Sequence, residues 1–95
     1  ERMKPQQHAE QAAIILKDRA DKLGDYKPLY NNIAARVNLS LGNKIAPGKK
    51  ITAADITKIL VEMKLARIDC GKPDSDHVWD AANYLFLFGG LTDEK

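Results

Sequence analysis

The sequence predicts an all-α domain of four helices joined by short loops. Apolar residues recur at spacings of three and four in four separate stretches, which is the period of an amphipathic helix. Glycine, proline and helix-capping residues separate these stretches. No segment keeps the strict alternation of apolar and polar residues that a half-buried strand requires. The fold class is therefore helix packed on helix.

Length and composition indicate one small globular unit. The 95 residues fit a single domain with one modest core, with residues 1–5 and 91–95 as loose tails. Positive and negative side chains are interleaved and the net charge is only +2, so the composition does not indicate nucleic-acid binding. We find no membrane-spanning stretch or signal peptide, and the single Cys70 cannot form an internal disulfide. These features predict a cytoplasmic protein without a membrane partner.

Two helices are expected in the first half of the chain. Residues 6–22 form the first one, and Gly24 ends it. The inward face is mostly alanine, so a neighbouring backbone can approach closely; it comprises Ala9, Ala12, Ala13, Leu16, Ala20 and Leu23. His8 lies on the exposed flank, and we interpret it as solvated. The second helix covers residues 28–41, with Pro28 in its first turn.

The stretch 51–71 predicts a long helix around which the other elements are arranged. Thr52 and Asp55 have the spacing of a capping box, and Gly71 can end the helix in a left-handed turn. The main apolar arc comprises Ile56, Ile59, Leu60, Met63 and Ala66, and a second apolar patch comprises Val61, Leu65 and Ile68. A helix with two apolar sides needs neighbours on two sides.

The last helix begins at Asp74 or Ser75 and is expected to end near Phe88, because two glycines follow. One side of this helix is apolar and comprises Val78, Ala81, Ala82, Leu85 and Phe88. Trp79 and Phe86 widen that side. Together with the second apolar patch, these two aromatic residues exceed what one modest core can cover. We therefore expect a homo-oligomer.

A polar cluster is predicted where the two C-terminal helices face each other. Its candidate ligand-binding residues are Lys64, Arg67, Asp76, Asp80, Asn83 and Tyr84. Asp76, Asp80 and Tyr84 are spaced four residues apart and share one helix face. Lys64 and Arg67 border the main apolar arc, where a cation needs an anion or a ligand.

Three interpretations of this cluster remain open. A bridge from Arg67 to Asp80 would be purely structural. Lys64 and Arg67 can instead contact the phosphate of a ligand. Paired carboxylates can also hold Mg²⁺ or another divalent cation, for which the candidate ligands are Asp80, Asp76 and Glu62. No catalytic nucleophile is evident.

Several short motifs occur together along the chain. They are Arg19 with Gly24-Asp25, Thr52-x-x-Asp55, Lys64-Leu65-Ala66-Arg67, Gly71-Lys72, and Asp76…Asp80…Tyr84. This pattern resembles a small domain family of unassigned function that is common in tailed phages and prophages. The resemblance covers about residues 18–88 and implies a phage-encoded protein. Leu23 and Asn83 depart from the tyrosine and glycine usual in that family.

That family is in turn distantly similar to the all-α, MazG-type nucleoside triphosphate pyrophosphohydrolases. The resemblance implies a nucleotide-sized pocket and magnesium held by helical carboxylates. This chain has Leu65 and His77 where the two metal-binding motifs need glutamate, so only Asp80 matches as a ligand. The resemblance therefore implies that binding remains and that catalysis is lost.

The sequence predicts a phage-encoded, cytosolic helical module that binds a nucleotide or another phosphorylated small molecule. The binding residues are the Lys/Arg/Asp cluster between the two C-terminal helices. The alternative from another class is a protein-binding or oligomerisation module, with a host protein as a candidate partner and a purely structural ion network. Magnesium-dependent pyrophosphohydrolysis of nucleoside triphosphates is the third hypothesis.

Overall fold

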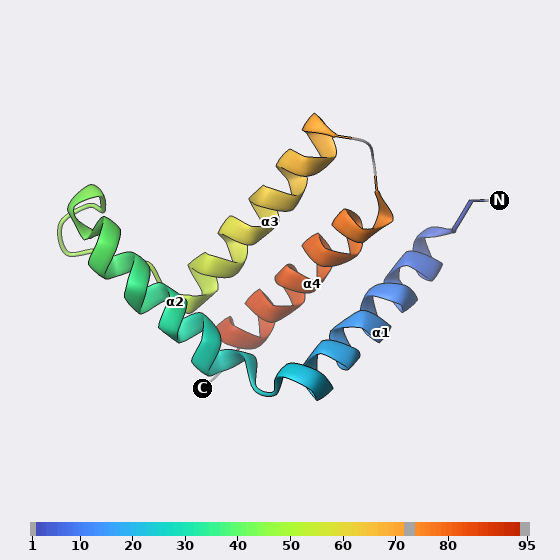
Figure 1. The fold of residues 1–95 in the computed structure, drawn as a ribbon, viewed down its shortest axis with the longest axis horizontal. Helices are drawn as coiled ribbons and strands as arrows, with labels where there is room; N and C mark the ends of the chain where they lie inside the picture. Colours follow the sequence, from blue (N-terminus) through green and yellow to red (C-terminus); the bar gives the residue numbers. More distant parts are fainter. Residues whose placement is uncertain (1, 72–73, 94–95) are drawn as a thin grey trace.

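Four α-helices build the described part of the chain, as the sequence predicts. The computed structural model describes residues 2–71 and 74–93. The elements are α1 (Pro5–Leu23), α2 (Tyr26–Leu41), the short 3₁₀ turn η1 (Gly42–Lys44), α3 (Ala53–Cys70) and α4 (Ser75–Thr92). Figure 1 shows α1, α4 and α3 side by side, while α2 crosses near one end of this layer. No strand occurs among the described residues, so the all-α class is confirmed.

The predicted start of α3 is confirmed in atomic detail. The Thr52 hydroxyl accepts a hydrogen bond from the Asp55 backbone N–H at 3.2 Å. The Asp55 carboxylate accepts one from the Thr52 N–H at 2.9 Å, which closes the capping box. These hydrogen bonds, first of all the one from the Thr52 backbone, lower the pKa of Asp55. The start of α3 is thus determined by residues three apart in sequence.

Side-chain caps also begin α2 and α4. Asp74 caps α4 by accepting a hydrogen bond from the Asp76 N–H at 3.0 Å, as expected. Asp25 caps α2 in the same way, through the Lys27 N–H at 3.0 Å. Because Asp25 is the cap, α2 begins two residues before Pro28, and the α1–α2 connection is correspondingly tighter than predicted.

Two predicted helix ends are wrong. Gly71 follows α3 with φ −128° and ψ −168°, which is extended backbone and not a left-handed turn. Helix α4 does not end near Phe88 but continues to Thr92. Gly90 is needed there for packing, because a Cβ at this position would collide with the Tyr26 hydroxyl of α2. The helix is prolonged because α2 lies against its last turns.

The core lies where α2 crosses α3 and α4. Its buried apolar residues are Tyr30, Ala34, Ala53 and Ile56. Leu60 and Leu87 are partly buried and pack against this cluster, as does Leu91, which the sequence assigned to a loose tail. Helix α1 stands apart from this core and packs mainly along α4, where Ala12 is buried.

Only the first half of the predicted apolar arc on α3 is covered. Ile56 is 4% exposed, whereas Ile59 is 53% and Met63 is 38% exposed. The difference arises because α2 lies across the N-terminal turns of α3 and leaves the later turns with α4 as their main neighbour. Of the second apolar patch, Leu65 is exposed and the other two residues are half-buried.

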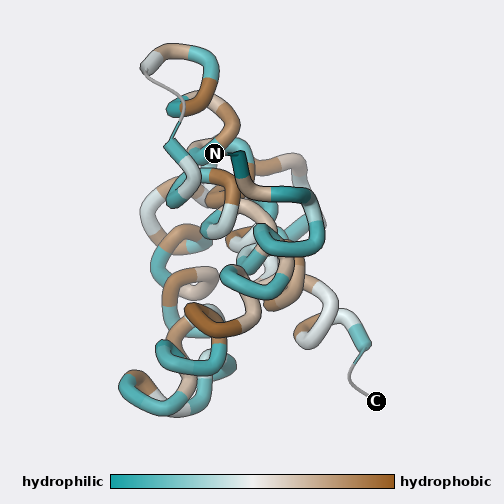
Figure 2. Tube along the Cα trace, turned by 90° about the vertical axis from the view of Figure 1, so that its right-hand side faces the viewer, coloured by the Kyte–Doolittle hydropathy of each residue, from teal (hydrophilic) through white to brown (hydrophobic). Residues whose placement is uncertain are grey.

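The chain is more extended than a typical domain of its length. The chain measures 51 × 32 × 21 Å, and its radius of gyration of 15.1 Å exceeds the roughly 12.4 Å typical of a 95-residue domain. Brown apolar and teal polar segments alternate along the helices in the edge-on view of Figure 2. None of the helices in the described part of the chain has the length and apolar content needed to cross a membrane.

Candidate functional site

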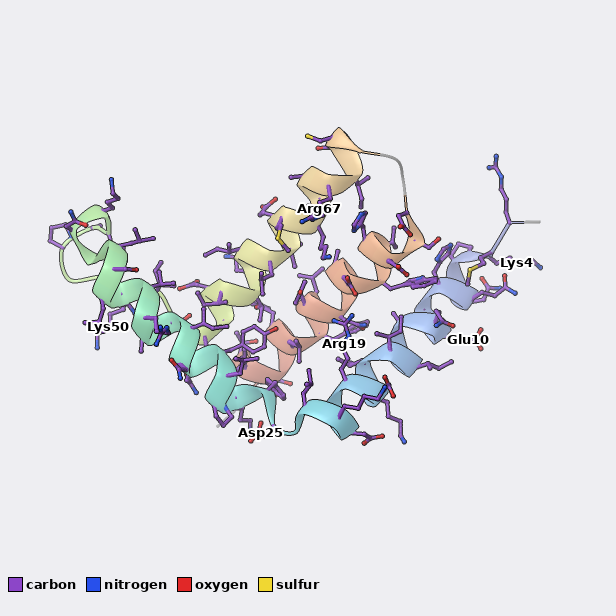
Figure 3. The ribbon with its side chains drawn as sticks, viewed as in Figure 1. Lys4, Glu10, Arg19, Asp25, Lys50 and Arg67 are labelled. Atoms are coloured by element: carbon purple, nitrogen blue, oxygen red, sulfur yellow. The ribbon has the colours of Figure 1, made fainter. Side chains whose placement is uncertain are left out.

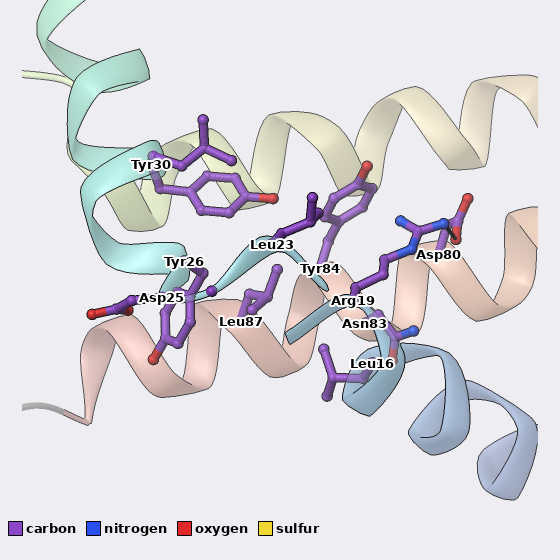
Figure 4. A pocket seen from close by; sticks show the side chains of 12 residues that line it. Leu16, Arg19, Leu23, Asp25, Tyr26, Tyr30, Asp80, Asn83, Tyr84 and Leu87 are labelled. Carbon is purple, nitrogen blue, oxygen red and sulfur yellow. Dashed lines mark hydrogen bonds and ion pairs between the residues drawn. The ribbon is translucent and has the colours of Figure 1, made fainter. Parts of the chain in front are cut away.

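A pocket lies between α1, α2 and α4 (Figure 4). Its apolar walls are Leu16, Leu23, Tyr26, Leu29, Tyr30 and Leu87, and its polar end is formed by Arg19, Asp80, Asn83 and Tyr84. The pocket has a volume of about 150 Å³. A cavity of that size in another protein accommodates benzene. The pocket therefore admits one ring-sized group.

The Asp80 carboxylate joins three helices at the polar end of the pocket. Nζ of Lys64 on α3 lies 3.1 Å from Oδ2, and Nη2 of Arg19 on α1 lies 3.5 Å from Oδ1. The side chains of Lys64 and Asp80 are only 14% and 15% exposed, whereas that of Arg19 is 54% exposed. The Lys64–Asp80 ion pair is thus shielded from solvent. The longer Arg19–Asp80 ion pair is solvent-exposed and contributes little stability, so Arg19 can exchange it for another anion.

Arg67 does not belong to this cluster. It is exposed and lies near the C-terminal end of α3, on a different helix from Arg19 (Figure 3). Among the described residues no ion pair joins Arg67 to Asp80, so the predicted structural bridge is wrong. Helices α3 and α4 are antiparallel, and their register brings Lys64 level with Asp80. Arg67, almost one turn farther along α3, lines a shallow hollow beside His77.

The predicted metal ligands are not assembled into a cation site. Glu62 and Asp76 are exposed, and both oxygens of Asp80 face cationic side chains. Within residues 2–71 and 74–93, no three His, Cys, Asp or Glu side chains form a group that could hold a metal ion. Mg²⁺ needs several oxygen ligands and would compete with two cations for Asp80. The geometry therefore gives the magnesium hypothesis no support.

Three tyrosines line the pocket, Tyr26 and Tyr30 from α2 and Tyr84 from α4. Tyr84 was predicted as a site residue, whereas Tyr30 was not. Burial raises the pKa of Tyr30 and the neighbouring Tyr84 raises it further, while Arg19 acts in the opposite direction. The Tyr30 phenol is therefore neutral at pH 7 and can donate a hydrogen bond into the pocket.

Asn83 is the most unusual polar group in the pocket wall. The residue is 6% exposed, and neither its Oδ1 nor its Nδ2 atom has a hydrogen-bond partner among the described residues. A buried polar group without a partner costs about 1–3 kcal/mol. A hydrogen-bonding group that entered the pocket and met this amide would remove that cost.

His8 is held by Trp79, so the prediction that it is simply solvated is wrong. The indole Nε1–H of Trp79 donates to Nδ1 of His8 at 2.9 Å, and the ring centroids are 6.1 Å apart. A buried tryptophan N–H requires an acceptor, and α1 supplies it from its first turns. The contact ties the start of α1 to α4.

Arg19 was not predicted as a site residue from the sequence, where it occurs only within the family motif. It lies three residues after Leu16 on the inward face of α1, where a cation among alanines was the available signal. What could not be read from the sequence is that this face meets Asp80 on α4.

A family model matches residues 7–92, which covers nearly all four helices. Its description is Domain of unknown function (DUF6378). The chain belongs to the DUF6378 family. No curated protein and no solved structure matches the chain. The family match agrees with the predicted resemblance to a family of unassigned function, and it carries no information about source or activity.

Proposed function

We propose that this DUF6378 domain binds a nucleotide-like small molecule, with its planar ring in the pocket and its phosphate at Arg19. The observation that carries the proposal is the combination of ring-sized apolar space with an exposed guanidinium at one end. Neither feature alone defines a ligand class. Together they fit a molecule with a flat apolar part and an attached anion.

The walls of the pocket suit a heterocyclic ring. Leu16 and Leu87 offer apolar contact, and the Tyr84 and Tyr30 side chains border the same space (Figure 4). Nucleobases carry hydrogen-bond donors and acceptors on their edges, which a simple aromatic ring lacks. The unpaired amide of Asn83, after a small side-chain rotation, would have a partner on such an edge.

Arg19 is the side chain suited to the phosphate. A guanidinium has five N–H donors, and here only Nη2 lies near Asp80. The remaining donors match the oxygens of a phosphate, to which arginine binds in a forked geometry. Lys64 has an indirect role in this proposal: it neutralises Asp80, so that the Arg19 charge is not cancelled. In this proposal Arg19 has the phosphate-binding role that the sequence suggested for Arg67.

The resemblance to MazG-type pyrophosphohydrolases favours the same ligand class. We also propose that the protein is phage-encoded and acts in the cytoplasm. Hydrolysis is not part of the proposal. Attack on a triphosphate needs metal ions held by several carboxylates, and the carboxylate of Asp80 is shared between two cations. We therefore propose a binding protein.

Titration of the ribonucleoside and deoxyribonucleoside monophosphates, followed by ¹⁵N NMR, tests the proposal. At least one should bind saturably and shift resonances of α1 and α4 around the pocket. Its parent nucleoside, which lacks the phosphate, should bind about tenfold or more weakly, since one charge-assisted hydrogen bond is lost.

A matched pair of variants sharpens the test. Arg19→Ala should weaken the nucleotide about tenfold or more, whereas Arg67→Ala, which removes the same charge from an exposed site, should leave affinity unchanged. Thermal melts of both variants show whether they fold. Absence of saturable binding by every monophosphate, or equal losses in the two variants, would overturn the proposal.

A further inference from the structure

Helix α4 has a second side with exposed apolar residues, opposite the pocket. Asp80, Tyr84 and Leu87 lie on the side that faces the pocket. Val78 and Leu85, seven residues apart, lie about half a turn away on the other side of the helix. Val78 is 45% and Leu85 is 51% exposed. We call the surface around these two residues the back face.

The back face extends over α1 through an apolar groove. The groove is lined by His8, Ala9 and Ala12 of α1 and by Val78, Trp79, Ala82 and Phe86 of α4. Its floor is shallow because three of these residues are alanines. Phe86, 55% exposed, borders the groove. The same face therefore carries a groove and, beside it, an exposed aromatic side chain.

The chain as a whole exposes more surface than a folded monomer of its mass usually does, and the back face is part of that surface. The chain has 7280 Å² of accessible surface, about 1,800 Å² more than the roughly 5,500 Å² expected for a folded monomer of 10.6 kDa. Obligate homodimers bury about 1,000–2,500 Å² from each subunit. The excess is thus of the size that one such interface removes.

The shape of the back face favours a second copy of the chain as the occupant. In a twofold interface each subunit presents the same patch, so the patch must be complementary to itself. A groove floored by alanine next to an exposed phenylalanine meets this requirement, because each Phe86 can enter the groove of the other subunit. The pocket lies on the opposite side of α4 and remains open in such a pair.

We propose that two copies of this chain form a twofold dimer through the back face, with Phe86 of each copy in the α1–α4 groove of the other. The dimer supplies the apolar burial that the small core of one chain lacks. Light scattering should report twice the mass of 10.6 kDa, and the melting temperature should rise with protein concentration.

Charge substitutions at exposed apolar residues test which face is used. Leu85→Glu and Phe86→Glu should weaken the dimer about 100-fold or more, because each buries two carboxylates across a twofold axis. Leu39→Glu is the matched control, since Leu39 is 87% exposed on α2 and lies outside the back face. It should leave the mass and the melting temperature unchanged.

A further measurement covers the case in which the back-face variants fail to fold. In a dimer assembled from differently labelled wild-type chains, the Phe86 ring should show intermolecular NOEs to the methyl groups of Ala9 or Ala12. A wild-type chain that is monomeric up to about 100 µM, with a melting temperature independent of concentration, would overturn the proposal. A dimer that survives both back-face variants, or one without these NOEs, would also overturn it.

Discussion

Two of the helix–helix seams in this domain are built on different principles. Where α2 crosses α3, the contact is apolar and its few polar groups are paired. Where α1 lies along α4, the contact consists of one buried alanine, a tryptophan–histidine hydrogen bond and the solvent-exposed Arg19–Asp80 ion pair. The firmly packed part of the molecule and the loosely packed part are therefore separate, and the pocket lies between them.

The α2–α3 seam is stabilised by a buried apolar cluster and by hydrogen bonds to the chain that leads into α3. Tyr30 and Ile56 belong to one buried cluster. Thr57 is fully buried, and its hydroxyl donates to the Ala54 carbonyl at 2.6 Å. The Asn38 side chain makes two hydrogen bonds to the backbone of Ile51, at 2.8 and 2.9 Å, and so fixes the chain entering α3. We expect such a seam to open only at a free energy close to that of global unfolding.

The α1–α4 seam has little apolar area of its own. Ala12 is its buried hydrophobic residue, and the Arg19 side chain is 54% exposed. Asn83 contributes an amide that has no hydrogen-bond partner among the described residues. Contacts of this kind separate at a lower free energy than a packed core. Because α1 supplies Arg19 and Leu16 to the pocket, a loosely held α1 can adjust to a ligand.

The largest expected effect is the loss of core packing on the α2–α3 side. Ile56→Ala should lower the free energy of unfolding by about 2–5 kcal/mol, because the residue is 4% exposed and leaves a cavity. Ile59→Ala deletes the same atoms from a side chain that is 53% exposed and should cost less than about 1 kcal/mol. Urea denaturation measures both. Equal losses would mean that the predicted single arc on α3 is buried after all.

A second pair of variants probes where α4 meets α2. Gly90→Ala should destabilise the protein by about 1–3 kcal/mol, because the new Cβ collides with the Tyr26 hydroxyl. Gly89→Ala meets no atom within 4 Å and should gain up to about 1 kcal/mol from the better helix propensity of alanine. Thermal unfolding compares the two. A stabilising Gly90→Ala would show that Tyr26 moves aside without loss of packing.

The smallest expected effect concerns the α1–α4 seam. Trp79→Phe keeps an aromatic ring but removes the N–H that bonds to His8, and should cost about 0.5–1.5 kcal/mol. Hydrogen exchange should become faster in α1, while the α2–α3 core keeps its protection. His8→Ala should act similarly, and the double variant should add little to either single change. Unchanged exchange in α1 would argue against this hydrogen bond as the tie between the helices.

Helix starts were predictable because their causes are local. The Thr52–Asp55 capping box and the Asp74 cap join atoms a few residues apart, so the sequence alone contains the whole interaction. The order and type of the four helices followed from apolar periodicity for the same reason. Lys64 was recognisable as a cluster residue because it borders an apolar arc, where a charge needs a partner. Asp80 was recognisable because it shares one helix face with Asp76 and Tyr84.

Partners across helices were decided by the tertiary structure. Lys64 and Arg67 are three residues apart and chemically similar, and only the antiparallel register of α3 against α4 selects Lys64 for Asp80. The position of α1 brings Arg19 to the same carboxylate, although 61 residues separate them in the chain. Gly90 continues a helix because Tyr26 lies over it. Periodicity specifies which side of a helix is apolar, but the neighbour that covers it depends on how the helices pack.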